Sequence, residues 1–213
     1  MPIQPPASDP AQYLDTLVPV RHAEMQRMED KAQQTKFPII GPAAGQFCYL
    51  LTRLIGARTV FEMGSGYGYS TAWFAQAVRD NGGGVVHHTV WDEQLSGEAR
   101  THLAALGLAG HVRFHVAEAV QTLRETAEQF DIIFNDILKR SYPAALPVIK
   151  AHLGRGGVLI SDNMLWHGAI FDTHDRSEDT EGIREFTRLM TTDPEWIVSL
   201  VPIRDGLLVA RRR

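Results

Sequence analysis

The stretch Val60-Phe61-Glu62-Met63-Gly64-Ser65-Gly66-Tyr67-Gly68-Tyr69-Ser70 decides the fold. The apolar run at 59–61 predicts a buried strand that ends at Glu62. The three alternate glycines allow a tight turn and close approach of a ligand, because no β-carbon stands in the way. Residues 70–78 have helical spacing, with Ser70 or Thr71 as candidate N-cap. Strand, glycine turn and helix together predict a nucleotide-binding element.

The spacing of this turn separates two ligand classes. A dinucleotide site favours Gly-x-Gly-x-x-Gly, with the pyrophosphate at the helix N-terminus. Here the pattern is Glu-x-Gly-x-Gly-x-Gly, and the carboxylate of Glu62 suits a ligand with a cationic group. The stretch resembles motif I of S-adenosylmethionine-dependent methyltransferases, whose ligand carries an ammonium and a sulfonium. An ordinary glycine-rich turn is the alternative.

Composition limits the classes of protein. A chain of 213 residues with 44% hydrophobic residues suits one α/β domain with a sizeable core. The formal net charge of -4 gives no electrostatic footprint for nucleic acid. The single cysteine, Cys48, excludes an intrachain disulfide framework. We find no apolar run of membrane-spanning length and no signal pattern, so we expect a cytoplasmic protein without a membrane partner.

Strands and helices alternate along the chain, which predicts an α/β fold with a doubly wound, mostly parallel sheet. We expect seven strands, the last two forming an antiparallel hairpin, at 59–62, 85–91, 112–116, 131–136, 158–162, 196–202 and 207–211. Helices are expected between them, among them 117–129, 142–153 before a glycine break at 154–157, and 178–190. Residues 1–213 are interpreted as one domain, with 1–36 as an N-terminal helical arm.

Carboxylates gather at the predicted strand ends: Glu62, Asp92, Glu118, Asp136 and Asp162. Ligands bind beyond the carboxyl ends of parallel strands, so these residues mark the expected site. Asp136, Asp162 and Asn163 supply hard oxygen ligands at two of those ends. That set fits Mg²⁺, with Mn²⁺ or Ca²⁺ as alternatives, and does not suit structural zinc.

At this point the chain resembles the cation-dependent O-methyltransferases, which include catechol and caffeoyl-coenzyme A O-methyltransferases. The resemblance covers almost everything from residue 37 to 210. It rests on Asp136-Ile137-Leu138-Lys139, on Asp162-Asn163-Met164-Leu165-Trp166-His167-Gly168, and on the ending Arg204-Asp205-Gly206-Leu207.

The resemblance implies a mechanism and a set of site residues. A divalent cation on Asp136, Asp162 and Asn163 would bind a catechol-like phenol, and Lys139 would take the proton of the attacking hydroxyl. S-adenosylmethionine would be bound by motif I, by Ser70 at its carboxylate and by Glu118 near its adenine. The assigned cofactor contacts are Glu62, Gly64, Gly66, Gly68, Ser70, Asp92, Glu118 and Asp136. Relatives are commonly homodimers, so we expect one here.

Two departures leave alternatives open. Val90 stands where the family usually has an acidic residue for the ribose, and Asp92 is the nearest substitute. Leu138 stands where many relatives have aspartate. The alternative functions are methylation of a hydroxyuridine in tRNA, against which the acidic chain argues mildly, and ligand binding without catalysis.

Overall fold

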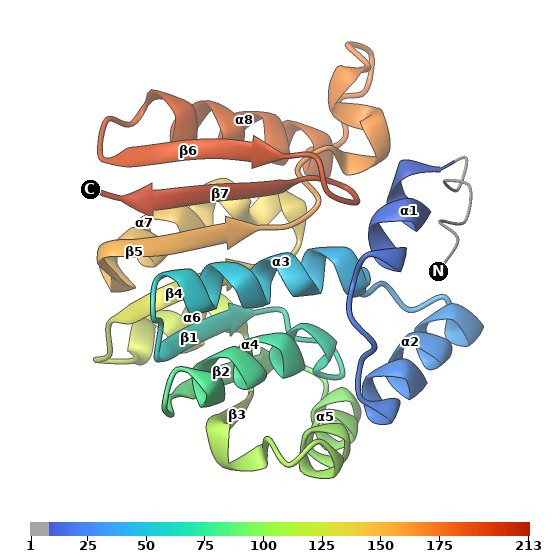
Figure 1. Ribbon diagram of the computed structural model, residues 1–213. Helices are drawn as coiled ribbons and strands as arrows, with labels where there is room; N and C mark the ends of the chain where they lie inside the picture. Colours follow the sequence, from blue (N-terminus) through green and yellow to red (C-terminus); the bar gives the residue numbers. More distant parts are fainter. Residues whose placement is uncertain (1–8) are drawn as a thin grey trace.

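The computed structural model describes residues 9–213, which form a seven-stranded sheet with helices on both faces (Figure 1). The strands are β1 (Thr59–Met63), β2 (Val85–Val90), β3 (Val112–Val116), β4 (Phe130–Asn135), β5 (Leu153–Ser161), β6 (Trp196–Val201) and β7 (Leu207–Arg212). Their order is β3-β2-β1-β4-β5-β7-β6. All neighbours are parallel except β5–β7 and β7–β6. The expected doubly wound, mostly parallel sheet with a C-terminal antiparallel hairpin is confirmed.

The register of the parallel strands brings their carboxyl ends to one edge of the sheet. Val60 of β1 lies opposite Val86 of β2 and Ile132 of β4. Asn135 at the end of β4 lies opposite Ser161 at the end of β5. The residues that follow these two strands, Asp136 and Asp162, are therefore neighbours at that edge.

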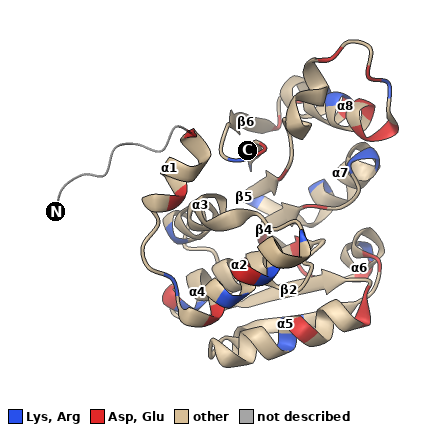
Figure 2. Ribbon diagram, turned by 90° about the vertical axis from the view of Figure 1, so that its right-hand side faces the viewer, with Lys and Arg blue, Asp and Glu red and all other residues tan. Residues whose placement is uncertain are grey.

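Helices on the two faces of the sheet close two hydrophobic cores (Figures 1 and 2). The helices are α1 (Pro10–Thr16), α2 (Ala23–Thr35), α3 (Gly41–Leu54), α4 (Tyr69–Asp80), α5 (Glu93–Ala105), α6 (Ala119–Glu125), α7 (Tyr142–His152) and α8 (Glu178–Thr192). Because side chains alternate along a strand, Val60 packs with α3 and α4 while Phe61 packs with α6 and α7. Both faces of β1 are buried, as expected for a parallel strand.

The N-terminal segment contributes two short helices, α1 and α2, as its composition predicts; residues 1–8 of the expected arm lie outside the described residues. The α2 helix buries Met25 and Met28 completely. The hydroxyl of Tyr67, in the glycine turn, donates to the carbonyl oxygen of Met28 at 2.9 Å. This contact fixes α2 beside the carboxyl edge of the sheet.

Two predicted boundaries were wrong. The helix expected at 117–129 is only α6, because Glu118 caps its start and Thr126 is extended (φ -76°, ψ 146°). Thr126 Oγ1 accepts from the amide of Glu128, a local bond that competes with the helix. The glycine break expected at 154–157 lies inside β5. The pairing of β5 with β4 shifts in register there, from Leu153 opposite Phe130 to Val158 opposite Ile132.

Within residues 9–213, no helix has both the length and the apolar character needed to cross a membrane.

Candidate active site

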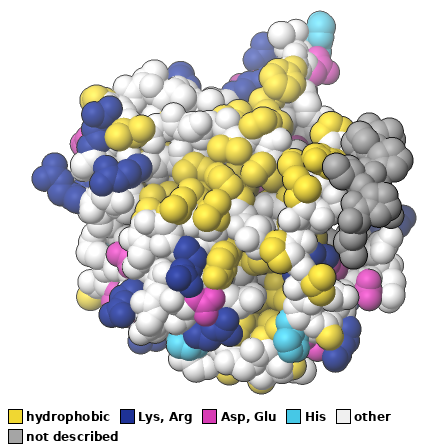
Figure 3. Space-filling view, in the orientation of Figure 1, with side chains coloured by type: hydrophobic (Ala, Val, Ile, Leu, Met, Phe, Trp, Pro, Cys, Tyr) yellow, Lys and Arg dark blue, Asp and Glu magenta, His cyan; other side chains and the backbone are white. Residues whose placement is uncertain are grey.

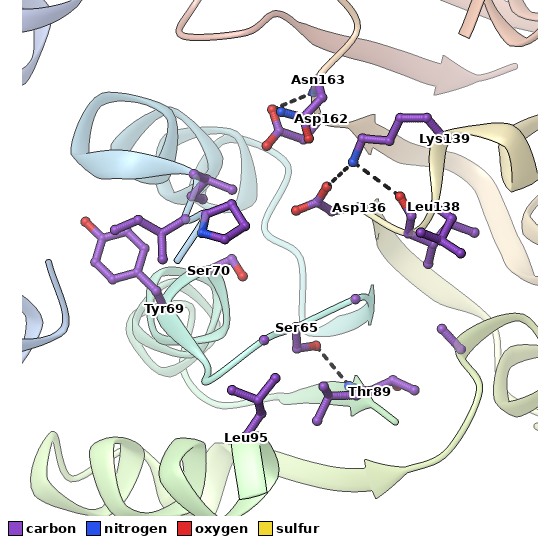
Figure 4. Close-up of a pocket in the computed structure, with 18 of the residues that line it drawn as sticks. Ser65, Tyr69, Ser70, Thr89, Leu95, Asp136, Leu138, Lys139, Asp162 and Asn163 are labelled. Atoms are coloured by element: carbon purple, nitrogen blue, oxygen red, sulfur yellow. Dashed lines mark hydrogen bonds and ion pairs between the residues drawn. The ribbon is translucent and has the colours of Figure 1, made fainter. Parts of the chain in front are cut away.

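A cavity of about 700 Å³ opens at the carboxyl ends of β1, β2, β4 and β5. Its size is typical of a small-molecule site. The wall is built from segments far apart in the sequence: 37–40, 64–70, 89–95, 117–119, 136–141, 162–167, Asp179 and Arg204, though not every residue of each range contributes. Figure 4 shows the polar side chains of Asp136, Lys139, Asp162 and Asn163 gathered on one side of this cavity and Ser70 across from them.

The glycine turn after β1 forms part of the cavity wall. Gly64 has φ +88°, and a β-carbon there would lie 2.4 Å from the carbonyl oxygen of Asp136. Gly64 and Gly66 line the cavity, whereas Gly68 packs on α5, where a β-carbon would lie 3.0 Å from that of Ala99. The turn is therefore compressed against the residue that follows β4.

The start of α4 differs from the expectation. Its N-cap is Gly68 (φ +91°), not Ser70 or Thr71, because the chain turns in a left-handed conformation one residue before Tyr69. Ser70 is buried, lies in the first helical turn and lines the cavity. It thus sits at the positive end of the α4 dipole, where an anionic group is stabilised.

Glu62 lies behind the turn and does not line the cavity. It is completely buried and accepts a hydrogen bond from Thr71 Oγ1, while Oε1 has no hydrogen-bond partner within the described chain. Burial raises the pKa of its carboxyl group to about 7, although Ser70, Thr71 and Ser65 oppose the shift. Thr71 Oγ1 is also 2.9 Å from His88 Nδ1, so Glu62 belongs to a polar network inside the sheet.

Asp136 and Lys139 form an ion pair on the floor of the cavity. Lys139 Nζ donates to Asp136 Oδ1 at 2.6 Å and to the carbonyl oxygen of Ile137 at 3.2 Å. Lys139 is only 8% exposed, and its ammonium lies 5.4 Å from the ring centroid of Tyr142 and 5.8 Å from that of Trp166. The two residues expected to act together are brought together here (Figure 4).

Asp162 and Asn163 follow β5 and reach the same cavity. Asp162 Oδ1 accepts from the backbone amide of Asn163 at 2.7 Å, and Oδ2 accepts from Arg204 at 3.0 Å. The side-chain amide of Asn163 donates to Asp205 Oδ2 at 3.1 Å, which leaves its carbonyl oxygen available as a ligand atom.

Electrostatics support the use of these residues as cation ligands. Desolvation raises the pKa of the Asp136 carboxyl group, against the opposing effects of Lys139 and Arg204. Burial and the negative charge of Asp136 raise the pKa of Asp162 to about 7. A buried carboxylate whose pKa is raised by a neighbouring carboxylate favours a bound cation, so the oxygen donor set fits Mg²⁺. No cluster of three His, Cys, Asp or Glu side chains suited to a metal occurs among the described residues, since the third donor here is an amide.

The end of β2 differs from a simple ribose site. Val90 lines the cavity, as does Trp91, whose side chain is exposed. Asp92 lies outside the cavity wall and caps α5, accepting from the amide of Leu95 at 2.9 Å. Glu118 lines the cavity, but its carboxylate also caps α6 through the amides of residues 120 and 121.

Two residues with no assigned role in the sequence analysis belong to this site. Arg204 lines the cavity, and Asp205 holds Asn163 and the backbone amide of His167. Both lie in the turn between β6 and β7, and only the family-like ending of the chain pointed to that turn. Side-chain contacts between residues 42 positions apart, such as Arg204 with Asp162, leave no pattern in the sequence.

The chain has a doubly wound sheet with an antiparallel C-terminal hairpin, and its glycine turn faces a pair of a carboxylate and a lysine. These two features define a methyltransferase-like class of enzyme. The comparisons specify the class further. A family model described as O-methyltransferase matches residues 13–213. The chain therefore belongs to the O-methyltransferase family.

Relatives and solved structures agree with this assignment. A catechol O-methyltransferase of Niastella koreensis is 26% identical over 180 residues, covering 80% of each chain. The O-methyltransferase from Bacillus cereus, solved in complex with SAH, is 26% identical, with a TM-score of 0.85 over 95% of this chain and 96% of that one. Cofactor-bound Rv0187 from MTB is 25% identical, with a TM-score of 0.86 over 99% of each. The expected enzyme class, an S-adenosylmethionine-dependent O-methyltransferase, is confirmed.

Proposed function

We propose that this enzyme transfers the methyl group of S-adenosylmethionine to a hydroxyl of a small catechol-like phenol, with a divalent cation bound at Asp136, Asp162 and Asn163. The observation that carries the proposal is the pairing of Lys139 with Asp136 in a cavity also lined by Asp162 and Asn163. The catechol O-methyltransferase among the relatives supports the phenolic substrate.

The cofactor would occupy the side of the cavity formed by β1, β2 and α4. Gly64 and Gly66 give its methionyl part room, and Ser70 with the α4 N-terminus would bind its carboxylate. Glu118 and the exposed indole of Trp91 would flank the adenine. Glu62 and Gly68 act from behind the turn, by fixing its conformation.

The metal would be held by one carboxylate oxygen from each aspartate and by the carbonyl oxygen of Asn163. When bound, such a cation lowers the pKa of a coordinated hydroxyl and orients two vicinal oxygens. The chain contributes the positions of these ligands: Asp205 orients the Asn163 amide, and the Asn163 backbone amide fixes Asp162.

In its neutral amine form, Lys139 would accept the proton of the attacking hydroxyl and become the ammonium. Its ammonium lies in a water-poor position between Tyr142 and Trp166, and Asp136 holds it at the cavity floor. Holding acceptor, base and cofactor in one cavity converts an encounter of separate molecules into a reaction within one complex.

Methyl transfer to caffeic acid, measured with Mg²⁺ and with chelator, tests the proposal. We expect turnover with Mg²⁺, loss with chelator, and loss in Asp162→Ala. Asp193→Ala is the matched control, because Asp193 pairs with Lys150 outside the cavity. Turnover that persists in chelator would refute the metal, and absence of turnover over a broad panel of catechols would refute the phenolic substrate.

The expected homodimer also remains part of the proposal. Hydrophobic side chains gather on the face that contains α3 (Figure 3). The exposed ones include Leu50 and Leu54 on α3, Tyr13 on α1 and Leu17 directly after α1. A second copy of the chain would cover such a patch. Sedimentation equilibrium of the wild type and of Leu54→Glu tests this, and a wild-type monomer would refute it.

A further inference from the structure

Arg204 occupies an unusual backbone position at the edge of the metal site. It lies in the turn between β6 and β7 with φ +53°, a conformation that residues with a β-carbon rarely adopt. Such strain persists only where surrounding contacts impose it, and it concentrates at functional sites. Here the residue in this conformation is an arginine that lines the cavity.

The turn that carries Arg204 is fixed to the loop after β5. Asp205, 6% exposed, accepts from the Asn163 side chain and from the His167 backbone amide. Its carbonyl oxygen accepts from the amide of Leu165 at 2.8 Å, and that of Gly206 accepts from Met164 at 3.0 Å. Four hydrogen bonds therefore hold this turn at the metal ligands, so the place of Arg204 is not that of a loose surface arginine.

The guanidinium of Arg204 already holds one of the metal ligands. Its Nη1 atom lies 3.0 Å from Asp162 Oδ2, in an ion pair whose aspartate side chain is 2% exposed. The other oxygen of Asp162 accepts from the Asn163 backbone amide. Each oxygen of Asp162 therefore already accepts a hydrogen bond, and a cation that binds Oδ2 meets the positive charge of the guanidinium at close range.

Two carboxylates of the site already have cationic partners within the chain. Asp136 is paired with Lys139 and Asp162 with Arg204, so two carboxylates meet two cations. A dication that binds Asp136 and Asp162 meets two carboxylates already neutralised in part by their partners, and a guanidinium at close range. Both effects weaken its binding.

We infer that Arg204 is a built-in competitor for the divalent cation: its guanidinium holds Asp162 until a metal displaces it, and so keeps the affinity for metal low. The inference rests on the metal site of the proposed function and assigns a residue that regulates it. Arg204 acts through Asp162 and is a positioning residue, not a catalytic one.

Binding of Mn²⁺ alone, followed by electron paramagnetic resonance, tests this without any turnover. In Arg204→Met, which removes the charge and keeps an unbranched side chain, we expect Mn²⁺ to bind about tenfold tighter or more, because the competing pair is lost. Arg204→Lys keeps a cation and should stay within about threefold of the wild type. Arg204→Gly also removes the charge, and it relieves the backbone strain. It should likewise bind Mn²⁺ more tightly than the wild type, and it serves as the test if Arg204→Met folds poorly.

Lys36→Met is the matched control. Lys36 is an exposed cation at φ +55° that does not line the cavity, so its removal changes charge at the same backbone conformation elsewhere. Its Mn²⁺ affinity should equal that of the wild type. Adding Asp162→Asn to Arg204→Met should abolish the gain, which locates the gain at this carboxylate.

The outcomes separate the inference from the proposed function. If the wild type binds Mn²⁺ and both Arg204→Met and Arg204→Gly bind it no more tightly than the wild type, the inference is overturned. The proposed metal site is not affected by that result. Binding by these variants and not by the wild type supports the inference in its strongest form. No Mn²⁺ binding by any variant overturns the inference and the metal site, while methyl transfer in chelator reports separately on the enzyme class.

Discussion

The ammonium of Lys139 lies 2.6 Å from the Asp136 carboxylate, three residues earlier in the chain. The backbone between them leaves β4 and enters a 3₁₀ turn that begins at Lys139 (η2, Lys139–Ser141), which folds the side chain back over the strand end. Lys139 also donates to the carbonyl oxygen of Ile137, so two acceptors fix its direction. This geometry keeps a buried amine at the cavity floor.

Replacement of Lys139 by methionine should lower kcat by about 10²- to 10⁴-fold, the usual contribution of a general base. The cofactor affinity should remain unchanged, because Lys139 lies on the β4 side of the cavity. Steady-state kinetics with a catechol and calorimetry with S-adenosylmethionine measure the two quantities. Lys150→Met is the control, since Lys150 pairs with Asp193 and Glu195 outside the cavity. A wild-type kcat in Lys139→Met would remove Lys139 from the mechanism.

Gly64→Ala should abolish cofactor binding and destabilise the fold. A β-carbon would lie 2.4 Å from the Asp136 carbonyl oxygen, so the turn has to move away from β4. Gly107→Ala is the control, because Gly107 also has positive φ (+69°) but no atom within 4 Å of the added carbon. The control should lose only about 1–2 kcal/mol in the free energy of unfolding, which is the cost of a β-carbon at positive φ. Gly64→Ala should lose clearly more. Urea unfolding and calorimetry with S-adenosylmethionine measure both effects; equal losses would show that the close contact is unimportant.

The parts of the fold that follow from side-chain periodicity could be predicted from the sequence. The apolar run at 132–134 indicates a buried strand, and β4, which contains it, lies in the middle of the sheet. Because parallel strands share a carboxyl edge, the same pattern predicted that Asp136 and Asp162 would meet, and they do line one cavity.

The parts of the site that depend on single side-chain directions could not be predicted. A turn sequence does not reveal that Arg204 takes a positive φ and points at Asp162. Polar residues at helix starts likewise have two possible partners, the ligand or the free backbone amides. Asp92 and Glu118 both cap helices, and composition alone cannot choose between these uses.

Asp92→Ala separates capping from ribose binding. The carboxylate accepts from the Leu95 amide and lies outside the cavity wall, so we expect a loss of about 1 kcal/mol in stability with unchanged affinity for S-adenosylmethionine. Asp92→Asn should restore much of the stability, since asparagine also caps helices. Chemical denaturation and calorimetry provide the measurements. An affinity reduced about tenfold, or 1.4 kcal/mol, would instead assign the ribose to Asp92.

The buried carboxyl group of Glu62 should make stability depend on pH. Burial raises its pKa from 4.5 to about 7, so the folded protein binds this proton more tightly than the unfolded chain does. Its contribution is therefore fully present below about pH 4.5 and is lost as the pH rises through about 7. The shift corresponds to roughly 3 kcal/mol.

Glu62→Gln removes this titration and can still accept the hydrogen bond from Thr71. Relative to the wild type, the variant should therefore gain stability between pH 5 and pH 8, as measured by urea unfolding at each pH. The difference between the two proteins isolates Glu62 from other groups that titrate in this range, such as Asp162. Glu185→Gln is the control, because Arg188 lowers the pKa of that exposed carboxyl group and its titration lies below this range. Parallel curves for the wild type and Glu62→Gln would show that Glu62 is already ionised in the folded protein at pH 5.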